Sequence, residues 1–443
     1  MNRLACICGL AAWFLSPLQA APAYRQVQAE EVRPREGIGH LLAKIEAGRP
    51  ITVAYLGGSI TAMNGWRNKT TDWLRKTYPK TTFTEINAAI GGTGSDLGVF
   101  RLGHDALRHN PDLLFVEFAT NDGGAAPEAI WQTMEGIVRQ TWKKDPTTDI
   151  VFTYTITAAF TNDYCRGVCN RSASAMELLA DHYGIPSVGF GPRVARLINE
   201  HKLMMDAREI EATVPRETPE RNRVVRERIK TDGRLLFADD SVHPRDEGHA
   251  LYLPSITNAF TRMRDSKPAD HRAKLAVPFV PDNFEQAKMV PVSSSMLTGS
   301  WQALPEDNAL MRSFSNRMGQ IWFSEAPGST LTFSVRGRRV CLYDLLGPDG
   351  GQVRVSVDGA PAGKPIPRFD SYCTYHRIAT LWVAQFPDDG KTHRITVTVD
   401  PEQPDRHPVA FRLKDPEKEL KEPKYQGTKF WVSQIMLLGD LVE

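Results

Sequence analysis

The sequence predicts two folded domains, first an α/β domain built on a parallel sheet and then a β-sandwich. The chain has 443 residues, 41% of them hydrophobic, which is enough for more than one core. Over residues 51–263, short apolar, β-branched runs alternate with longer helical patterns, as in parallel sheets flanked by helices. In the last third of the chain, short runs of alternating polarity are separated by Asp-Gly and Gly-Gly turns, which is typical of antiparallel sandwiches and jelly rolls.

The first twenty residues have the build of a secretory signal peptide. Arg3 precedes an apolar run over residues 4–15, and small residues follow, so cleavage is expected after Ala20 or Ala23. The apolar run is too short for a membrane span, which needs about 20 residues. We therefore expect a secreted or periplasmic protein that is not inserted in a membrane after signal cleavage.

The α/β domain is expected over residues 21–266. Its strands are expected at residues 51–57, 82–90, 113–118, 150–157 and 187–190. Its helices are expected at residues 70–78, 97–109, 127–143, 173–183, 193–203 and 247–263. Right-handed crossovers bring the carboxyl ends of such strands to one edge of the sheet, where ligands bind.

Three further segments complete the predicted organisation. Residues 206–234 are highly charged and lack an apolar stripe, so we interpret them as a partly helical insertion, either a lid beside the site or a surface excursion without a role. Residues 267–283 are rich in proline, alanine and charge and are expected to form a linker or a strap between the domains. Residues 284–443 are then the sandwich domain, with strands expected at 330–335, 340–345, 352–357, 380–384 and 393–399.

Charge and cysteine content narrow the class of protein. Lys and Arg number 54 against 52 Asp and Glu, and this balance lacks the basic excess of a protein that binds nucleic acid. Four cysteines remain after the signal peptide, in a compartment that permits disulfides. Cys165 could pair with Cys169 and Cys341 with Cys373, or all four could be free thiols.

A serine stands where the first strand is expected to end. In Gly57-Gly58-Ser59 the glycines permit a tight turn, and the serine begins a helical pattern at the edge where ligands bind. An N-cap role would explain Ser59 equally well. The segment is not the nucleophile elbow Gly-x-Ser-x-Gly, because Thr61 occupies the position of the second glycine.

A second segment offers a base and its orienting acid. Asp240 lies three residues before His243, so the carboxylate can fold back onto one ring nitrogen while the other faces a nucleophile. Asp239 competes with Asp240 for this role, and a turn aspartate with a surface histidine is the alternative explanation.

Two loops after the next strands could stabilise an oxyanion. Gly92 lies in a glycine-rich loop whose backbone N–H can reach the site, and Asn121 follows the third strand with a side-chain amide. Each could instead be a simple turn residue. The position of all these segments at the carboxyl ends of strands is harder to explain by turns alone.

In this order, these segments resemble the SGNH, or GDSL-like, hydrolase superfamily over about residues 51–263. The resemblance implies a three-layer α/β/α fold in which Ser59 is the nucleophile of a triad with His243 and Asp240. It also implies that the Ser59 and Gly92 backbone amides and the Asn121 side chain bind the oxyanion. The chain departs from the family in reading Gly-Gly-Ser for Gly-Asp-Ser and Ala-Thr-Asn-Asp for Gly-x-Asn-Asp.

The sandwich domain resembles the jelly-roll modules of secreted carbohydrate esterases. We therefore expect a secreted serine esterase that removes O-acetyl or other small acyl groups from a polysaccharide or glycan, without a metal or organic cofactor. A glycan O-acyltransferase and a non-catalytic glycan-binding protein are the alternatives. Aromatic residues of this domain could stack on sugars or belong to its core: Trp301, Trp322, Tyr372, Tyr375 and Trp382.

Overall fold

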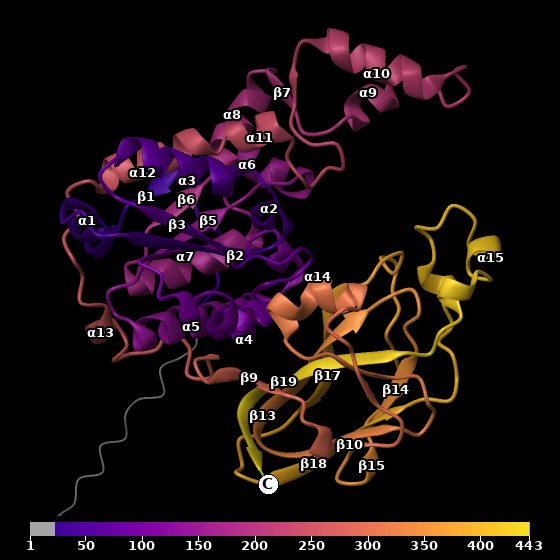
Figure 1. Cartoon of the computed structure of the whole chain (residues 1–443). Helices are drawn as coiled ribbons and strands as arrows, with labels where there is room; N and C mark the ends of the chain where they lie inside the picture. Colours follow the sequence, from indigo (N-terminus) through magenta and orange to yellow (C-terminus); the bar gives the residue numbers. More distant parts are fainter. Residues whose placement is uncertain (1–22, 443) are drawn as a thin grey trace, which may run out of the picture.

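The computed structural model describes residues 23–442, so the predicted signal peptide lies outside the described residues. An α/β domain is followed by an antiparallel β domain, and the two pack side by side (Figure 1). Within residues 23–442, no helix is long and apolar enough to cross a membrane.

The α/β domain is built on a six-stranded sheet in the order β1-β6-β5-β4-β2-β3. Its strands are β1 (Val32–Arg33), β2 (Ile51–Gly57), β3 (Phe83–Asn87), β4 (Leu113–Glu117), β5 (Asp149–Tyr154) and β6 (Ser187–Gly189). The five expected strands run parallel, as predicted. The two-residue edge strand β1 is antiparallel to β6 and is too short to produce a periodicity in the sequence.

Helices cover both faces of this sheet and give the expected three layers (Figure 1). One face carries α4 (Ser95–Asp105), α5 (Pro127–Lys144) and α7 (Arg171–Tyr183), which pack on one another. The other carries α3 (Trp66–Thr77), α6 (Thr161–Cys165), α8 (Gly191–Asn199), α11 (Asp246–Ala250) and α12 (Leu253–Met263). The helix expected at 247–263 is broken into α11 and α12, because Pro254 starts a new helix.

Short helical segments occupy the loops of this domain. They are α1 (Gly39–Glu46), α2 (Ser59–Ala62), η1 (Leu107–His109), η2 (Asn121–Gly124) and η3 (Ala158–Phe160). The first of them, α1, precedes β2 and contacts both β2 and β5.

The charged insertion is a small subdomain that projects from the α/β domain (Figure 1). It contains α9 (Arg208–Ala212) and α10 (Arg221–Asp232), and the paired strands β7 (Leu203–Met204) and β8 (Leu235–Leu236) close its base. A core of its own holds it together, formed by Met204, Ile210, Val214, Val225 and Leu236. The expectation of a partly helical segment is met, and the apolar stripe is missing because this core is so small.

Residues 267–283 pack along the α/β domain, as expected of a strap. They contain α13 (His271–Lys274), whose His271 ring stacks on Trp142 of α5 with centroids 4.3 Å apart. Further along, the backbone N–H groups of Phe279 and Val280 donate to the buried carboxylate of Glu135 at 2.6 and 2.7 Å. The segment is therefore a strap fixed to the domain surface.

The second domain is one antiparallel sheet of eleven strands. They are β9 (Ala287–Pro291), β10 (Leu297–Thr298), β11 (Gln302–Ala303), β12 (Trp322–Ser324), β13 (Thr330–Leu346), β14 (Gln352–Val357), β15 (Ala360–Pro361), β16 (Ile366–Pro367), β17 (Arg377–Gln385), β18 (Thr392–Val399) and β19 (Phe430–Val442). The helical segments are η4 (Ser294–Met296), α14 (Ala309–Met318), η5 (His407–Val409), α15 (Pro416–Glu419) and η6 (Pro423–Tyr425).

The strands expected at 330–335 and 340–345 are in fact the single strand β13. It pairs with β18 through its first half, with β17 through its second half, and with β19 along much of its length. Gly337 and Gly439 are paired residues of β13 and β19, and a Cβ on Gly337 would lie 2.5 Å from the Gly439 Cα. Glycine at 337 therefore allows the two long paired strands to approach closely, and the chain continues through it as one strand.

The domains share a continuous apolar core and polar contacts. Helix α14 places Arg317 over the α/β domain, where the guanidinium donates to the Asn87 carbonyl at 2.5 Å and lies 3.3 Å from the Asp105 carboxylate. The four cysteines 165, 169, 341 and 373 are free thiols, and so neither of the possible disulfides is formed.

Candidate active site

The residues singled out by their sequence come together at the carboxyl edge of the parallel sheet. Ser59 is the first residue of α2, directly after β2, and Gly92 lies in the loop after β3. Asn121 begins η2 after β4, while Asp240 and His243 lie in the loop between β8 and α11. Four separate connections thus supply the site, as expected for a parallel sheet.

A chain of hydrogen bonds links three of these side chains. Ser59 Oγ lies 2.7 Å from His243 Nε2, and His243 Nδ1 lies 2.6 Å from Asp240 Oδ2. The hydroxyl can therefore donate to the imidazole while the imidazole donates to the carboxylate. This is the geometry in which a histidine takes a proton from a serine.

The turn that carries Asp240 also fixes its carboxylate. Oδ1 accepts hydrogen bonds from the backbone N–H groups of Val242 and His243 at 3.0 and 2.8 Å, which leaves Oδ2 for the ring. Ser241, between Asp240 and Val242, adopts a positive φ of 70°, and its carbonyl accepts a hydrogen bond from the Ala158 N–H at 2.9 Å. Burial would raise the pKa of Asp240, but the hydrogen bonds from His243 and Val242 outweigh it and lower the pKa.

Asp239, the competitor for the acid position, lies elsewhere. Its carboxylate is 3.5 Å from the Arg245 guanidinium, and its side chain is 74% exposed. The aspartate that contacts His243 is therefore Asp240.

Asn121 and Gly92 lie beside the serine. A Cβ on Gly58 would overlap Asn121 Oδ1, so the amide of Asn121 packs directly against the residue before Ser59. A Cβ on Gly91 would lie 3.5 Å from the Cβ of Ser59, and Gly92 has a positive φ of 73° with open space around it. Glycine is thus required at 58 for close approach, and the loop at 91–92 lies against Ser59.

Sequence reasoning missed a buried carboxylate under this site. Glu117 ends β4, is 1% exposed, and accepts hydrogen bonds from the hydroxyls of Thr61 and Thr155 at 2.8 and 2.7 Å. Burial raises its pKa, against the opposing effect of these hydroxyls and of the backbone N–H groups of Gly58 and Thr120. Glu117 therefore ties the serine loop to the loop that carries Asn121, and its position at a strand end gave no sign of this.

Arg101 is a second missed support, and it belongs to α4. Its guanidinium donates to the carbonyls of Gly57 at 3.1 Å and of Ala88, and it pairs with Asp105 at 2.9 Å. The arginine is 1% exposed, and its hydrogen bonds connect the end of β2 with the residue that follows β3. A buried guanidinium with these partners fixes the backbone on both sides of the site.

Two cavities are lined by residues of this site. One of about 390 Å³ is lined by Gly92, Asn121 and Asp122 and also by Arg339, which comes from β13 of the second domain. Another of about 430 Å³ lies on the His243 side and includes Met63. The second domain therefore forms part of the wall next to the possible oxyanion donors.

The aromatic residues proposed for sugar stacking fall into two groups. Trp301 and Trp322 are half-buried and donate their indole N–H groups to backbone carbonyls. Tyr372, Tyr375 and Trp382 are exposed, and the Arg339 guanidinium lies 4.5 Å from the centre of the Trp382 ring. Of the five, Trp382 is the one joined to the first cavity by a contact.

Comparison with known proteins finds a family model that matches part of the chain and solved structures with a similar fold. Residues 55–251 match the model of the GDSL-like Lipase/Acylhydrolase family, whereas no curated protein matches the chain. The crystal structure of a two-domain esterase (CEX) active on acetylated mannans has a TM-score of 0.64 and 19% identity, over 91% of this chain and 95% of that one. The same esterase co-crystallised with mannopentaose gives 0.64 and 18%, over 91% and 94%. The two-domain fold predicted from the sequence is confirmed.

Proposed function

We propose that this protein is a serine esterase that removes O-acetyl groups from a polysaccharide. Its residues 55–251 match the model of the GDSL-like Lipase/Acylhydrolase family. The observation that carries the proposal is the hydrogen-bonded series Ser59, His243 and Asp240 beside the Asn121 amide. A binding protein would need none of these contacts. With the signal-peptide pattern at the N-terminus, the proposed site of action is outside the cytoplasm.

The proposed reaction begins with Ser59. His243 Nε2 takes the hydroxyl proton as Oγ attacks the ester carbonyl carbon, and Asp240 stabilises the imidazolium through Nδ1. The oxyanion of the tetrahedral intermediate then accepts hydrogen bonds from Asn121 Nδ2 and from the backbone N–H groups of Ser59 and Gly92. Collapse breaks the ester bond, and the sugar oxygen leaves with the proton from His243.

Water completes the proposed cycle. His243, neutral again, takes a proton from a water molecule whose oxygen attacks the carbonyl of the acetyl group on Ser59. The second tetrahedral intermediate uses the same donors, and its collapse returns the proton to Ser59 Oγ and releases acetate. No step needs an oxidant, a reductant or another substrate.

The surroundings of the site support a glycan as the alcohol portion of the ester. The cavity beside Asn121 is bounded by Arg339, and the guanidinium of Arg339 lies over the exposed ring of Trp382. An exposed indole offers an apolar face to a sugar ring, and the guanidinium offers donors to its hydroxyls. The esterase with the same two-domain fold is described as active on acetylated mannans, which makes a mannan the first polysaccharide to test.

Acetate release tests this proposal. The mature protein and its Ser59→Ala variant are incubated with acetylated mannan, acetylated xylan and acetylated monosaccharides, and free acetate is measured. We expect release by the first protein only, with the polysaccharides preferred over the monosaccharides. Equal release by both proteins, or none from any ester by folded protein, would contradict the proposal.

A further inference from the structure

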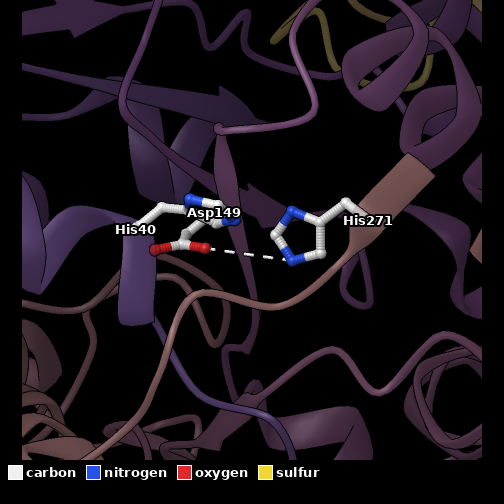
Figure 2. A group of neighbouring side chains, drawn as sticks. All are labelled: His40, Asp149 and His271. Atoms are coloured by element: carbon white, nitrogen blue, oxygen red, sulfur yellow. Dashed lines mark ion pairs between the residues drawn. The ribbon is translucent and has the colours of Figure 1, made fainter. Parts of the chain in front are cut away.

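A second cluster of reactive side chains lies away from the candidate active site. Figure 2 shows His40 from α1, Asp149 from the start of β5 and His271 from the start of α13. Asp149 is at the amino end of its strand, whereas Ser59 follows the carboxyl end of β2, so the cluster lies at the opposite edge of the sheet. One nitrogen of each ring and one carboxylate oxygen lie within 4.8 Å of one another.

Backbone carbonyls fix the tautomer of both histidines. His40 Nε2 lies 2.8 Å from the Ala269 carbonyl, and His271 Nδ1 lies 2.9 Å from the Pro146 carbonyl. A carbonyl oxygen can only accept, so each of these nitrogens carries a proton. In the neutral rings, Nδ1 of His40 and Nε2 of His271 are therefore left with free lone pairs. Histidines that bind metals are held in the same way, with the second ring nitrogen donating to a carbonyl or carboxylate.

Asp149 is held in place by backbone N–H groups of α1, and one of its oxygens lies near His271. Oδ2 accepts from the Leu41 N–H at 2.8 Å, while Oδ1 lies 3.9 Å from His271 Nε2. That separation is too long for a hydrogen bond. Two ligand atoms that share a zinc ion lie about 3.4 Å apart at tetrahedral angles with bonds of about 2.1 Å. A shift of about half an ångström would therefore allow an ion to bridge them.

The surroundings keep the cluster rigid and, among the described residues, leave Asp149 without an ion pair to a lysine or arginine. Asp149 is 1% and His271 6% exposed, and the His271 ring is stacked on Trp142 with 8° between the planes. The nearby ammonium of Lys44 is engaged by Asp112 at 2.7 Å. Within residues 23–442, His271 is the one basic group within ion-pair distance of Asp149.

We propose that His40, Asp149 and His271 bind one divalent transition-metal ion, and that this ion is zinc. Two imidazoles and one carboxylate are ligands that zinc favours, whereas calcium and magnesium prefer sites made of oxygen alone. His40 is half-buried, so a water molecule has access as the fourth ligand. The ion joins α1, β5 and the strap that leads to the second domain, and its role is to stabilise this junction.

Metal binding by the tag-free mature chain tests the proposal. After treatment with EDTA and gel filtration, the protein is titrated with Zn²⁺ by calorimetry, and its metal content and melting temperature are measured. We expect one equivalent of zinc and a higher melting temperature. Asp149→Asn keeps an acceptor for the Leu41 N–H and loses the anionic ligand, so zinc affinity should fall by about 10-fold or more. His40→Ala should have the same effect.

His182→Ala is the matched control. His182 also bonds to the strap, at 3.0 Å from the Val277 carbonyl, but belongs to no such cluster, and its loss should leave zinc affinity unchanged. Cobalt(II) gives a second measurement on the unaltered chain, because a site with two nitrogens and an oxygen produces visible absorption that zinc then displaces. Failure of the unaltered chain to bind zinc, or unchanged binding in folded Asp149→Asn and His40→Ala variants, would overturn the proposal.

Discussion

Replacing Asp240 by asparagine should place the wrong proton on His243. The two backbone N–H groups at Val242 and His243 hold one carboxylate oxygen, so in the Asp240→Asn variant they will select the amide oxygen. The amide NH₂ then faces His243 Nδ1, which must become an acceptor. The proton therefore moves to Nε2, where it meets Ser59 Oγ and blocks proton transfer from the serine.

The size of this effect can be bounded from the structure. An Asp-to-Asn change that imposes the wrong tautomer lowers turnover by roughly 10⁴-fold, or about 5 kcal/mol of barrier. The Asp240 side chain is 56% exposed, so water can replace part of its effect. We therefore expect kcat/KM to fall by roughly 10²- to 10⁴-fold.

The assay is hydrolysis of a small aryl acetate, with Asp239→Asn as the matched control. Asp239 is the adjacent carboxylate, and its 3.5 Å contact with Arg245 has no connection to the imidazole, so this variant should keep its activity. A loss of less than about 10-fold in Asp240→Asn, or an equal loss in both variants, would refute the tautomer argument.

Three further predictions concern the groups around the serine. Asn121→Ala should lower kcat about 10²-fold or more with little change in KM, because an oxyanion donor acts in the transition state, and steady-state kinetics on an aryl acetate within about threefold of the parent would contradict this. Glu117→Gln should lower the free energy of unfolding in urea by about 1–3 kcal/mol, since each carboxylate oxygen accepts a threonine hydroxyl and the amide nitrogen that replaces one oxygen cannot accept. Burial raises the pKa of Asp122 to about 7, above the unfolded value of about 3.9, so the folded state binds the proton more tightly and stability falls as the pH rises between these values. Asp122→Asn should therefore be the more stable protein at pH 8 by up to about 4 kcal/mol and lose this advantage near pH 4, as measured by urea unfolding at both pH values.

Much of the fold could be predicted from the sequence because buried parallel strands have a strong pattern. The runs around residues 51–57 and 113–118 are apolar apart from Thr52 and Glu117, as expected for strands covered on both faces. Residues 330–335 and 340–345 were predicted as two strands, because the continuation of β13 through Gly337 depends on its pairing with β19. The edge strand β1 depends on pairing with β6 and has no pattern of its own.

The sequence could single out a site residue where a chemically suitable side chain is expected at the carboxyl edge of the parallel sheet. Ser59 and His243 are of this kind, and the structure brings them within 2.7 Å. The choice between Asp239 and Asp240 required the turn geometry, since both are near His243 in sequence. Glu117 was missed because a residue at a strand end resembles any other until its hydrogen-bond partners from other loops are known.

The cluster in Figure 2 could not be predicted from the sequence, and a metal was not expected. His40, Asp149 and His271 lie in three distant segments, and none belongs to a motif with metal-ligand spacing. They meet because α1 and the strap both pack at the amino end of β5. Proximity of this kind is set by tertiary packing alone.

Labelling with a fluorophosphonate tests the central claim most directly. This reagent reacts with serines that a neighbouring base activates, and peptide mass spectrometry identifies the modified residue. We predict one adduct per chain, on Ser59, with loss of labelling in folded His243→Ala protein and retention in Asp239→Asn. Labelling at another serine, or equal labelling of Ser59 with and without His243, would contradict the account.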